Sequence, residues 1–283
     1  MTQQTQLLKA SLNYYTSLFC KILKYNLLNR FLFVLLDCKR QLIAIKLEHR
    51  MEITIDISAG NLKDRIPVSR ISGISSLTLN GTLNGDDIEF LRQHLGGYDI
   101  VDFRKAGPIE SIDLSGCNLV SGGIYKKSEF MGRYRGQMSI TRFMELWTST
   151  EIQGPGYGLK LLNADEISDE MFLGCYKFKR IVLPSEIKKI GDLAFYNCDN
   201  LTEIYIGDKL ESIGEYVFEN NFNLKEIHIR VKKPPILSEY AFGNPRYQNL
   251  PQTNPRKKIS VFVPRGCASD YWLQWGFDNV FEE

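Results

Sequence analysis

The sequence predicts an α/β repeat fold: a solenoid in which each unit of about 23 residues adds one strand to a parallel sheet. First, a phenylalanine recurs at a constant spacing at Phe172, Phe195 and Phe218, and Phe242 follows one residue later than that spacing requires. Second, a short alternating run recurs once per unit, as RIVLP, EIYIG, EIHIR and SVFVP. Alternation with a period of two is typical of a strand, and periods of about 20 to 50 residues are typical of stacked repeats.

A unit of this length cannot bury its apolar face by itself, so consecutive units must stack and join their faces into one core. The strand residues expected to point inward are Ile181 and Leu183, Ile204 and Ile206, Ile227 and Ile229, and Val261 and Val263. The recurring phenylalanine fills the interior together with the apolar residue that opens each unit, namely Ile167, Ile190, Ile213 and Leu237. Gly191 and Gly214 share one repeat position, where we expect a tight turn that a Cβ atom would obstruct.

The N-terminal copies match the repeat pattern less closely than the later ones. The segment 52–57, EITIDI, is predicted to be a strand. The segment 85–95, GDDIEFLRQHL, is predicted to be a short helix that begins near Asp86 or Asp87. Together the strand and the helix are expected to seal the first unit of the repeat.

The spacing between Ile112 and Ile181 is three times the repeat period. We therefore expect intermediate copies between them, and GLKLLNADEI supplies a partial one with Leu159 and Leu161 facing inward. The segment 121–157 matches the repeat poorly and is predicted to be an insertion or loop.

These patterns predict four parts of the chain. They are a non-core N-terminal extension or degenerate targeting segment at 1–50, an N-terminal cap with irregular first repeats at 51–120, the insertion or loop at 121–157, and regular repeats with a C-terminal cap at 158–283. The cap contains a dense aromatic cluster, Tyr271, Trp272, Trp275 and Phe277, which we interpret as core packing.

Residues 1–50 differ in composition from the rest of the chain. They carry eight basic and two acidic residues, a net charge of +6, whereas the remainder carries 27 and 31, a net charge of −4. The apolar run from Phe31 to Leu36 is shorter than a signal-peptide core and far too short to span a bilayer. The following LLDC resembles a damaged lipoprotein cleavage box, because Asp37 stands where a small residue should precede Cys38. The alternatives are an upstream extension, with folding that begins near Met51, or a cationic amphipathic helix at a membrane surface.

The cysteine pattern offers no metal or redox motif. None of the six cysteines forms a C-x-x-C pair. Cys175 and Cys198 lie one repeat apart, so stacking would bring them within reach of a disulfide, but buried free thiols are the favoured interpretation.

Catalytic motifs are also missing. The chain has only His49, His94 and His228, and it shows no zinc-protease, serine-hydrolase or phosphate-loop pattern. The sequence therefore predicts no metal site, no cofactor and no enzymatic activity. Only a cleft that brought Asp113, Lys160 and Cys117 together would favour an enzyme. The net charge is only +2, which does not indicate nucleic-acid binding. The short basic run PRKK at 255–258 is interpreted as a solvated turn and is too short to indicate it either.

The strand face offers the candidate binding residues. The residue between each inward pair must point outward, which gives a predicted column of Thr78, Asp113, Lys160, Val182, Tyr205, His228 and Phe262. Its later members form an exposed aromatic ladder, flanked by Glu203, Glu226 and Arg230. The alternative is that aromatic residues merely suit a strand surface. The candidate binding residues are Asp113, Lys160, Tyr205, His228, Arg230 and Phe262.

The repeated pattern IGxxAFxxCxxLxxIxI, as in IGDLAFYNCDNLTEIYI, resembles that of the BspA-like leucine-rich repeat proteins of bacterial surfaces. The resemblance covers about residues 160–243 closely, and it extends loosely to LTLNGTLNGDDIEFLRQHL, to IESIDLSGCNL and to the ending VFVPRGCASDYWLQWGF. It implies a leucine-rich repeat solenoid that is secreted or attached to the cell surface and binds host proteins or other cells.

We therefore expect a non-catalytic binding module, an adhesin-like protein that recognises a protein or glycan on a host or neighbouring cell. Membrane attachment is expected only through residues 1–50. The competing expectation is a structural spacer or envelope component with no specific ligand.

Overall fold

A computed structural model describes residues 51–66, 68–97, 109–126, 158–161, 164–243 and 254–283. The chain divides into two compact units, Met1–Arg50 and Met51–Glu283, and all of the described residues belong to the second unit. The predictions made for residues 1–50 and for most of 121–157 therefore lie outside the described residues.

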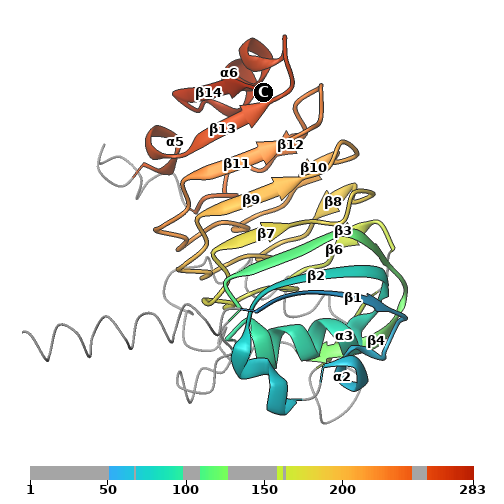
Figure 1. Ribbon diagram of the computed structural model, residues 1–283. Helices are drawn as coiled ribbons and strands as arrows, with labels where there is room; N and C mark the ends of the chain where they lie inside the picture. Colours follow the sequence, from blue (N-terminus) through green and yellow to red (C-terminus); the bar gives the residue numbers. More distant parts are fainter. Residues whose placement is uncertain (1–50, 67, 98–108, 127–157, 162–163, 244–253) are drawn as a thin grey trace, which may run out of the picture. The chain divides into compact units, whose positions relative to one another are not determined.

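Within the described ranges, eight strands form one sheet, in the order β1, β2, β3, β7, β9, β11, β13, β14, and every neighbouring pair is parallel (Figure 1). The strands are β1 (Met51–Ile57), β2 (Ile74–Leu83), β3 (Ser111–Leu119), β7 (Arg180–Val182), β9 (Glu203–Ile206), β11 (Glu226–Ile229), β13 (Ser260–Val263) and β14 (Asn279–Glu282). The predicted strands are confirmed, because the four alternating runs and EITIDI all lie in this sheet.

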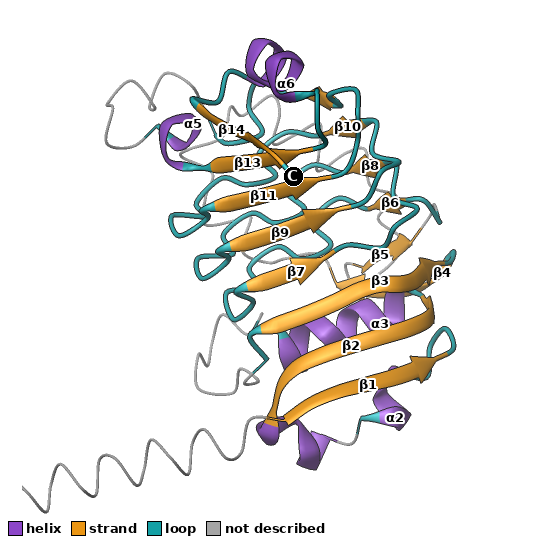
Figure 2. Ribbon diagram, turned by 45° about the horizontal axis from the view of Figure 1, so that its top comes forward, coloured by secondary structure: helices purple, strands orange, loops and turns teal. Residues whose placement is uncertain are grey.

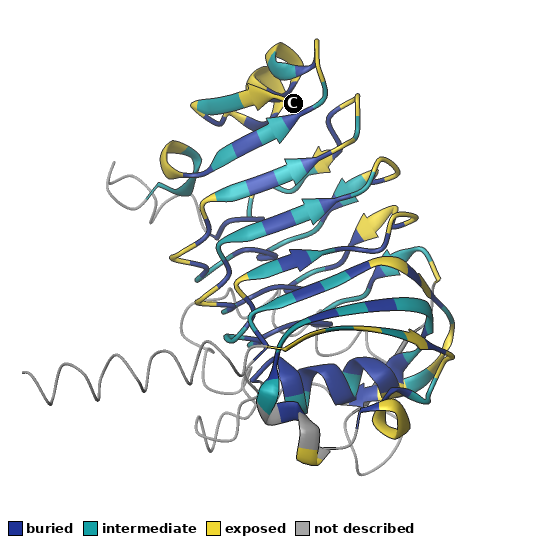
Figure 3. Ribbon diagram, viewed as in Figure 1, coloured by how far each residue is buried: buried dark blue, intermediate teal, exposed yellow. Residues whose placement is uncertain are grey.

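The register of the sheet follows the sequence period. Ile181 pairs with Ile204, and Ile204 pairs with Ile227, so each of these steps across the sheet is a step of one repeat period. All three side chains are at most 1% exposed, as predicted for the inward positions. Figure 3 shows the same alternation as buried and partly exposed bands along β9 and β11.

Each repeat also contributes a second, two-residue strand that the sequence patterns did not predict. These strands are β6 (Glu166–Ile167), β8 (Lys189–Ile190), β10 (Ser212–Ile213) and β12 (Ile236–Leu237). Among the described residues they form a four-stranded parallel sheet, which stacks beside the long strands (Figure 2). The apolar residue that opens each unit therefore lies in this sheet.

The recurring phenylalanines form the predicted interior row. The ring centroids of Phe172 and Phe195 are 5.4 Å apart, those of Phe195 and Phe218 are 6.0 Å apart, and those of Phe218 and Phe242 are 5.2 Å apart. All four side chains are buried. One aromatic ring per repeat thus packs on the ring of the repeat before it, which joins the repeats into a single core.

The recurring glycine is required because a Cβ atom would be obstructed, as predicted, but the obstruction is not that of a left-handed turn. Neither Gly191 nor Gly214 has a left-handed backbone, so neither is needed for a turn. Instead, a Cβ atom on Gly191 would lie 2.3 Å from Oδ1 of Asp169, and one on Gly214 would lie 2.3 Å from Oδ1 of Asp192. The glycine leaves room for the aspartate of the preceding repeat.

The N-terminal part of the sheet is covered by the predicted helix. Helix α3 (Gly85–Phe90) continues into a π-helical segment, η2 (Leu91–Leu95). Asn84 caps it, since its side chain accepts hydrogen bonds from the backbone N–H groups of Asp86 and Asp87. The short α2 (Leu62–Arg65) and the 3-10 helix η1 (Val68–Gly73) complete this part.

The expectation of intermediate copies between Ile112 and Ile181 is wrong. β3 pairs directly with β7, and Ile112 lies opposite Ile181, so no intermediate strand separates them in the sheet. The predicted partial copy is strand β5 (Gly158–Leu161), which pairs antiparallel with β4 (Gly122–Lys126) in a separate hairpin. The β4–β5 hairpin is a two-stranded sheet separate from the parallel one, so β5 does not extend the repeat.

At the C-terminal end, helix α6 (Ala268–Trp275) packs against β14. The expected aromatic packing holds for Tyr271, Trp275 and Phe277, which are buried, but Trp272 is 59% exposed. Trp272 immediately follows the buried Tyr271 on the helix, so it points to a different side. The basic run at Pro255–Lys258 forms the short helix α5 rather than a turn.

Candidate functional site

The outward residues of the long strands form one continuous column. Successive pairs across the sheet are Thr78 with Asp113, Asp113 with Val182, Val182 with Tyr205, Tyr205 with His228, His228 with Phe262, and Phe262 with Phe281. Lys160, which was predicted to belong to this column, lies in β5 and is not part of the sheet. The outward column is thus the predicted one without Lys160 and with Phe281 added.

The late members of this column, Tyr205, His228, Phe262 and Phe281, form what we call the aromatic ladder. The Tyr205 and His228 rings are nearly parallel, with centroids 4.2 Å apart, and those of His228 and Phe262 are 4.4 Å apart. The ring centroids of Phe262 and Phe281 are 5.5 Å apart, and the planes of the two rings are tilted by 30°. Both faces of the His228 ring are therefore covered by neighbouring rings.

Arg180 extends the ladder on the other side of Tyr205. Its guanidinium carbon lies 4.3 Å from the centre of the Tyr205 ring, which is a cation–π contact. Glu203 orients both groups: its Oε2 atom accepts a hydrogen bond from the Tyr205 hydroxyl at 3.2 Å and lies 3.7 Å from Nε of Arg180. Partial burial raises the pKa of Tyr205, which is consistent with a hydroxyl that donates to Glu203.

Carboxylates hold His228 at both ring nitrogens. Nδ1 lies 3.2 Å from each carboxylate oxygen of Glu283, and Nε2 lies 3.2 Å from Oε2 of Glu226. A doubly protonated imidazole can donate to both carboxylates, whereas a neutral one can donate to only one of them. The position of the ring is thus fixed by two stacking partners and two polar partners.

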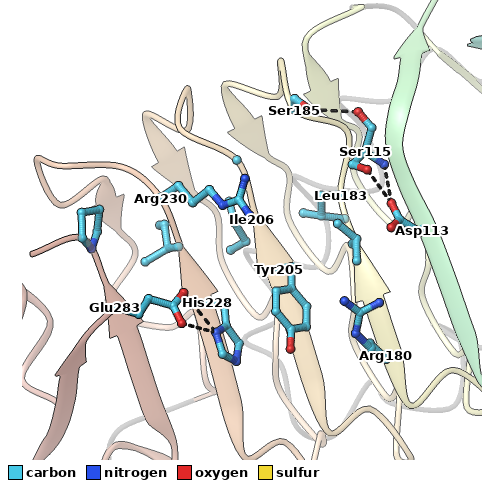
Figure 4. A pocket seen from close by; sticks show the side chains of 14 residues that line it. Asp113, Ser115, Arg180, Leu183, Ser185, Tyr205, Ile206, His228, Arg230 and Glu283 are labelled. Atoms are coloured by element: carbon cyan, nitrogen blue, oxygen red, sulfur yellow. Dashed lines mark hydrogen bonds and ion pairs between the residues drawn. The ribbon is translucent and has the colours of Figure 1, made fainter. Parts of the chain in front are cut away.

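Next to the ladder lies a hollow of about 860 Å³ on the strand face (Figure 4). The residues that line it are Asp113, Ser115, Arg180, Val182, Leu183, Ser185, Tyr205, Ile206, Gly207, His228, Ile229, Arg230, Pro264 and Glu283. They come from the long strands and from the residues that directly follow these strands. The repeat therefore places a concave surface of mixed polar and apolar residues at one end of the strands.

Gly207 keeps this hollow open. A Cβ atom at this position would lie 2.5 Å from the backbone oxygen of Ser185 in the preceding repeat. Close packing between consecutive repeats thus excludes a side chain at a position where Arg230 stands one repeat later.

The structure brings together four of the six candidate residues, because Asp113, Tyr205, His228 and Arg230 all line the hollow. Phe262 belongs to the ladder but does not line the hollow, and Lys160 lies in the separate hairpin.

Sequence reasoning missed Arg180, Ser115, Ser185 and Glu283 as residues of the hollow. The repeat register was a usable signal for Arg180, since it lies one repeat period before Glu203 and pairs with it. The sequence carried no such signal for Glu283, which reaches His228 only because β14 joins the sheet after β13.

The thiols of this part of the chain are buried rather than poised to react. The described cysteines, Cys117, Cys175, Cys198 and Cys267, are all free and buried, so the favoured interpretation of Cys175 and Cys198 is confirmed. Burial, reinforced by Asp113 and Asp87, raises the pKa of Cys117 to about 12. A thiol with such a pKa is a poor nucleophile at neutral pH.

Among the described residues, no group of histidine, cysteine, aspartate and glutamate side chains could hold a metal ion. In the same part of the chain, no helix has the length and apolar character needed to cross a membrane.

The parallel sheet, with its regular register and its interior row of rings, defines the described part of the chain as a repeat fold. Residues 162–267 match the BspA type leucine rich repeat region in six copies, and this part of the chain is a BspA-type leucine-rich repeat region. No curated protein matches the chain.

Proposed function

We propose that the chain is a non-catalytic binding module that recognises a protein or glycan through the aromatic ladder and the adjacent hollow. The observation that carries the proposal is the fixed stack of Arg180, Tyr205, His228 and Phe262 beside a concave surface. Aromatic residues and arginine are the favoured anchors of protein interfaces. The family match supports a module of this kind, because leucine-rich repeats generally bind rather than catalyse.

The geometry favours binding without rearrangement. His228 already has two ring neighbours and two carboxylate partners, so its side chain has little rotational freedom to lose when a ligand arrives. Restricting a side chain on binding costs roughly 0.5–1.5 kcal/mol when it is free beforehand. A surface that is rigid before binding avoids this penalty.

The finer architecture is also part of the proposal. We propose that the described residues form one solenoid of about 23 residues per coil, in which α3 and β1 cap the first coil and α6 and β14 cap the last. Support comes from the repeat register of the sheet and from the buried Tyr271 and Trp275, whose side chains donate to the backbone oxygens of Val231 and Pro235. In this scheme 51–120 is the N-terminal capped part and 158–283 is the regular part.

The location of the protein is proposed from its family. BspA-type leucine-rich repeats are typically associated with bacterial surfaces, and on this basis we propose a secreted or surface-attached, adhesin-like protein. Its partners would be proteins or glycans of a host or neighbouring cell rather than nucleic acid. Any membrane attachment would be made through residues 1–50.

The test is binding of the full chain to an array of extracellular proteins and glycans. We expect saturable binding that is reduced about tenfold or more in the Tyr205→Ala, His228→Ala double variant. Phe222→Ala is the matched control, because Phe222 is 80% exposed and does not line the hollow. Equal binding by the double variant would exclude the strand face, and no binding to any component would favour a structural spacer.

A further inference from the structure

The aromatic ladder presents ring edges rather than ring faces, and this restricts the ligand. His228 has Tyr205 on one face at 4.2 Å and Phe262 on the other at 4.4 Å, while the second face of Tyr205 is covered by Arg180. A sugar ring that stacked on Tyr205 or His228 would have to displace one of these neighbours. The part of the ladder beside the hollow is therefore a poor platform for a stacked sugar.

Arg230, which follows β11, gives the hollow a free positive charge. The Arg230 side chain is exposed, and no described residue forms a hydrogen bond or an ion pair with its guanidinium group. The other arginine of the hollow, Arg180, is already engaged by Tyr205 and Glu203. Because Gly207 has no side chain, the surface beside Arg230 is open to a ligand carboxylate.

At its β3 end the hollow also carries a free hydrogen-bond acceptor, the carboxylate of Asp113. Oδ1 of Asp113 accepts hydrogen bonds from the backbone N–H of Ser115 at 2.9 Å and from its hydroxyl at 2.7 Å. No described residue donates to Oδ2 of Asp113, so this oxygen can accept from a ligand. Figure 4 shows Asp113 at one edge of the hollow and Arg230 near its middle, next to Ile206.

The sheet sets the separation of the two strands that carry these charges. Asp113 lies on β3 and Arg230 directly follows β11, and β7 and β9 stand between these strands. Three steps of about 4.8 Å place the two strands roughly 14 Å apart. An extended peptide covers this distance in about four residues at ~3.3 Å per residue.

We infer that the hollow binds an extended peptide segment that carries a basic side chain and, about four residues away, an acidic one. The basic group pairs with Asp113, the acidic group pairs with Arg230, and the residues between them cross Val182, Tyr205 and Ile206. This inference rests on the proposed function, since it names the ligand class of the same surface.

The test uses labelled synthetic peptides that contain one Lys and one Glu, separated by different numbers of uncharged residues, titrated against the full chain. We expect saturable binding that is tightest at a spacing of about four residues and about tenfold weaker with the Arg230→Glu variant. Lys232→Glu is the matched control, because Lys232 is exposed and does not line the hollow.

A charge-swap experiment gives a second readout. A chain carrying both Asp113→Lys and Arg230→Glu should again bind these peptides, now with the peptide Glu at position 113 and the peptide Lys at position 230. Recovery of the binding that is lost in the Arg230→Glu variant also shows that the doubly substituted chain is folded.

Binding that is independent of spacing, or equal in the wild type and the Arg230→Glu variant, overturns the inference. Binding of heparin fragments that depends on Arg230, with no peptide bound at about 1 mM, also overturns it and assigns the hollow to an acidic glycan. If array binding depends on Tyr205 and His228 while no peptide binds, the proposed function stands and this inference alone fails.

Discussion

The carboxylate of Asp169 accepts a hydrogen bond from the backbone N–H of Asp192, one repeat later, at 2.8 Å. Asp192 in turn accepts one from the backbone N–H of Glu215 at 2.7 Å. Gly191 and Gly214 directly precede these donors, and their missing side chains allow the close approach. Burial, together with the charge of Asp192, raises the pKa of Asp169, whose side chain is half-buried in this contact.

Replacing Gly191 by alanine should therefore destabilise the fold. The new Cβ atom would lie 2.7 Å from the Asp169 backbone nitrogen, which cannot move aside as a flexible side chain can. We expect a loss of about 2 kcal/mol or more in the free energy of unfolding, measured by urea denaturation. Gly266→Ala is the control, because that site is spatially open and carries only a backbone penalty of about 1–2 kcal/mol at its φ of 79°. An equal or larger loss in the control would refute the packing explanation.

The phenylalanine row should carry much of the stability of the repeats. Phe195 is fully buried between Phe172 and Phe218, so Phe195→Ala should lower the free energy of unfolding by about 3–5 kcal/mol. The same substitution at the exposed Phe222 should change it by less than about 0.5 kcal/mol. Similar denaturation midpoints for the two variants would mean that the row is not a continuous core.

Glu219 should make the fold less stable as the pH rises. Burial raises the pKa of this carboxyl to about 7 from its ordinary value of 4.5. Between these values the folded chain binds more protons than the unfolded chain, so stability present at low pH is lost as the pH rises to about 7. Glu219→Gln should remove this loss and stabilise the chain by about 1–2 kcal/mol at pH 8, allowing for the partial exposure of the side chain. The free energy of unfolding of the wild type and of the variant is measured by urea denaturation at pH 5 and at pH 8. If the difference between the two proteins is the same at both pH values, the prediction is wrong.

The buried thiols should resist modification in the folded chain. Burial raises the pKa of Cys175 to about 12 and that of Cys198 well above its ordinary value, and the Cys198 thiol also donates to the backbone oxygen of Phe172 at 3.1 Å. We expect iodoacetamide at pH 8 to leave both unmodified until urea is added, as read from peptide masses. A mass corresponding to a Cys175–Cys198 disulfide in the unreduced protein would show that the thiols are not free.

Much of the fold could be predicted from the sequence because two independent periodicities agree. Alternation within each run fixes which residues face inward, and the constant spacing between runs fixes their partners on the next strand. Together they placed Tyr205, His228 and Phe262 side by side, and the structure bears this placement out.

The remaining features depend on contacts that leave no periodic trace. A two-residue strand such as β8 is too short to show alternation, so the second sheet was missed. Leu193 and Tyr216 have positive φ values, a conformation that leucine and tyrosine rarely adopt and therefore do not signal. Lys160 was misplaced because β4 competes for its strand, and Glu283 was missed because its contact depends on β14.

The most direct test of the account is hydroxyl-radical footprinting of the full chain, alone and with whichever array component or peptide it binds. We expect the ligand to protect Tyr205 and His228, while Phe222 and Trp272 remain as reactive as before. Protection of Trp272 and Leu273 on α6, with Tyr205 and His228 unchanged, would contradict the claim that the ladder and its hollow form the binding surface.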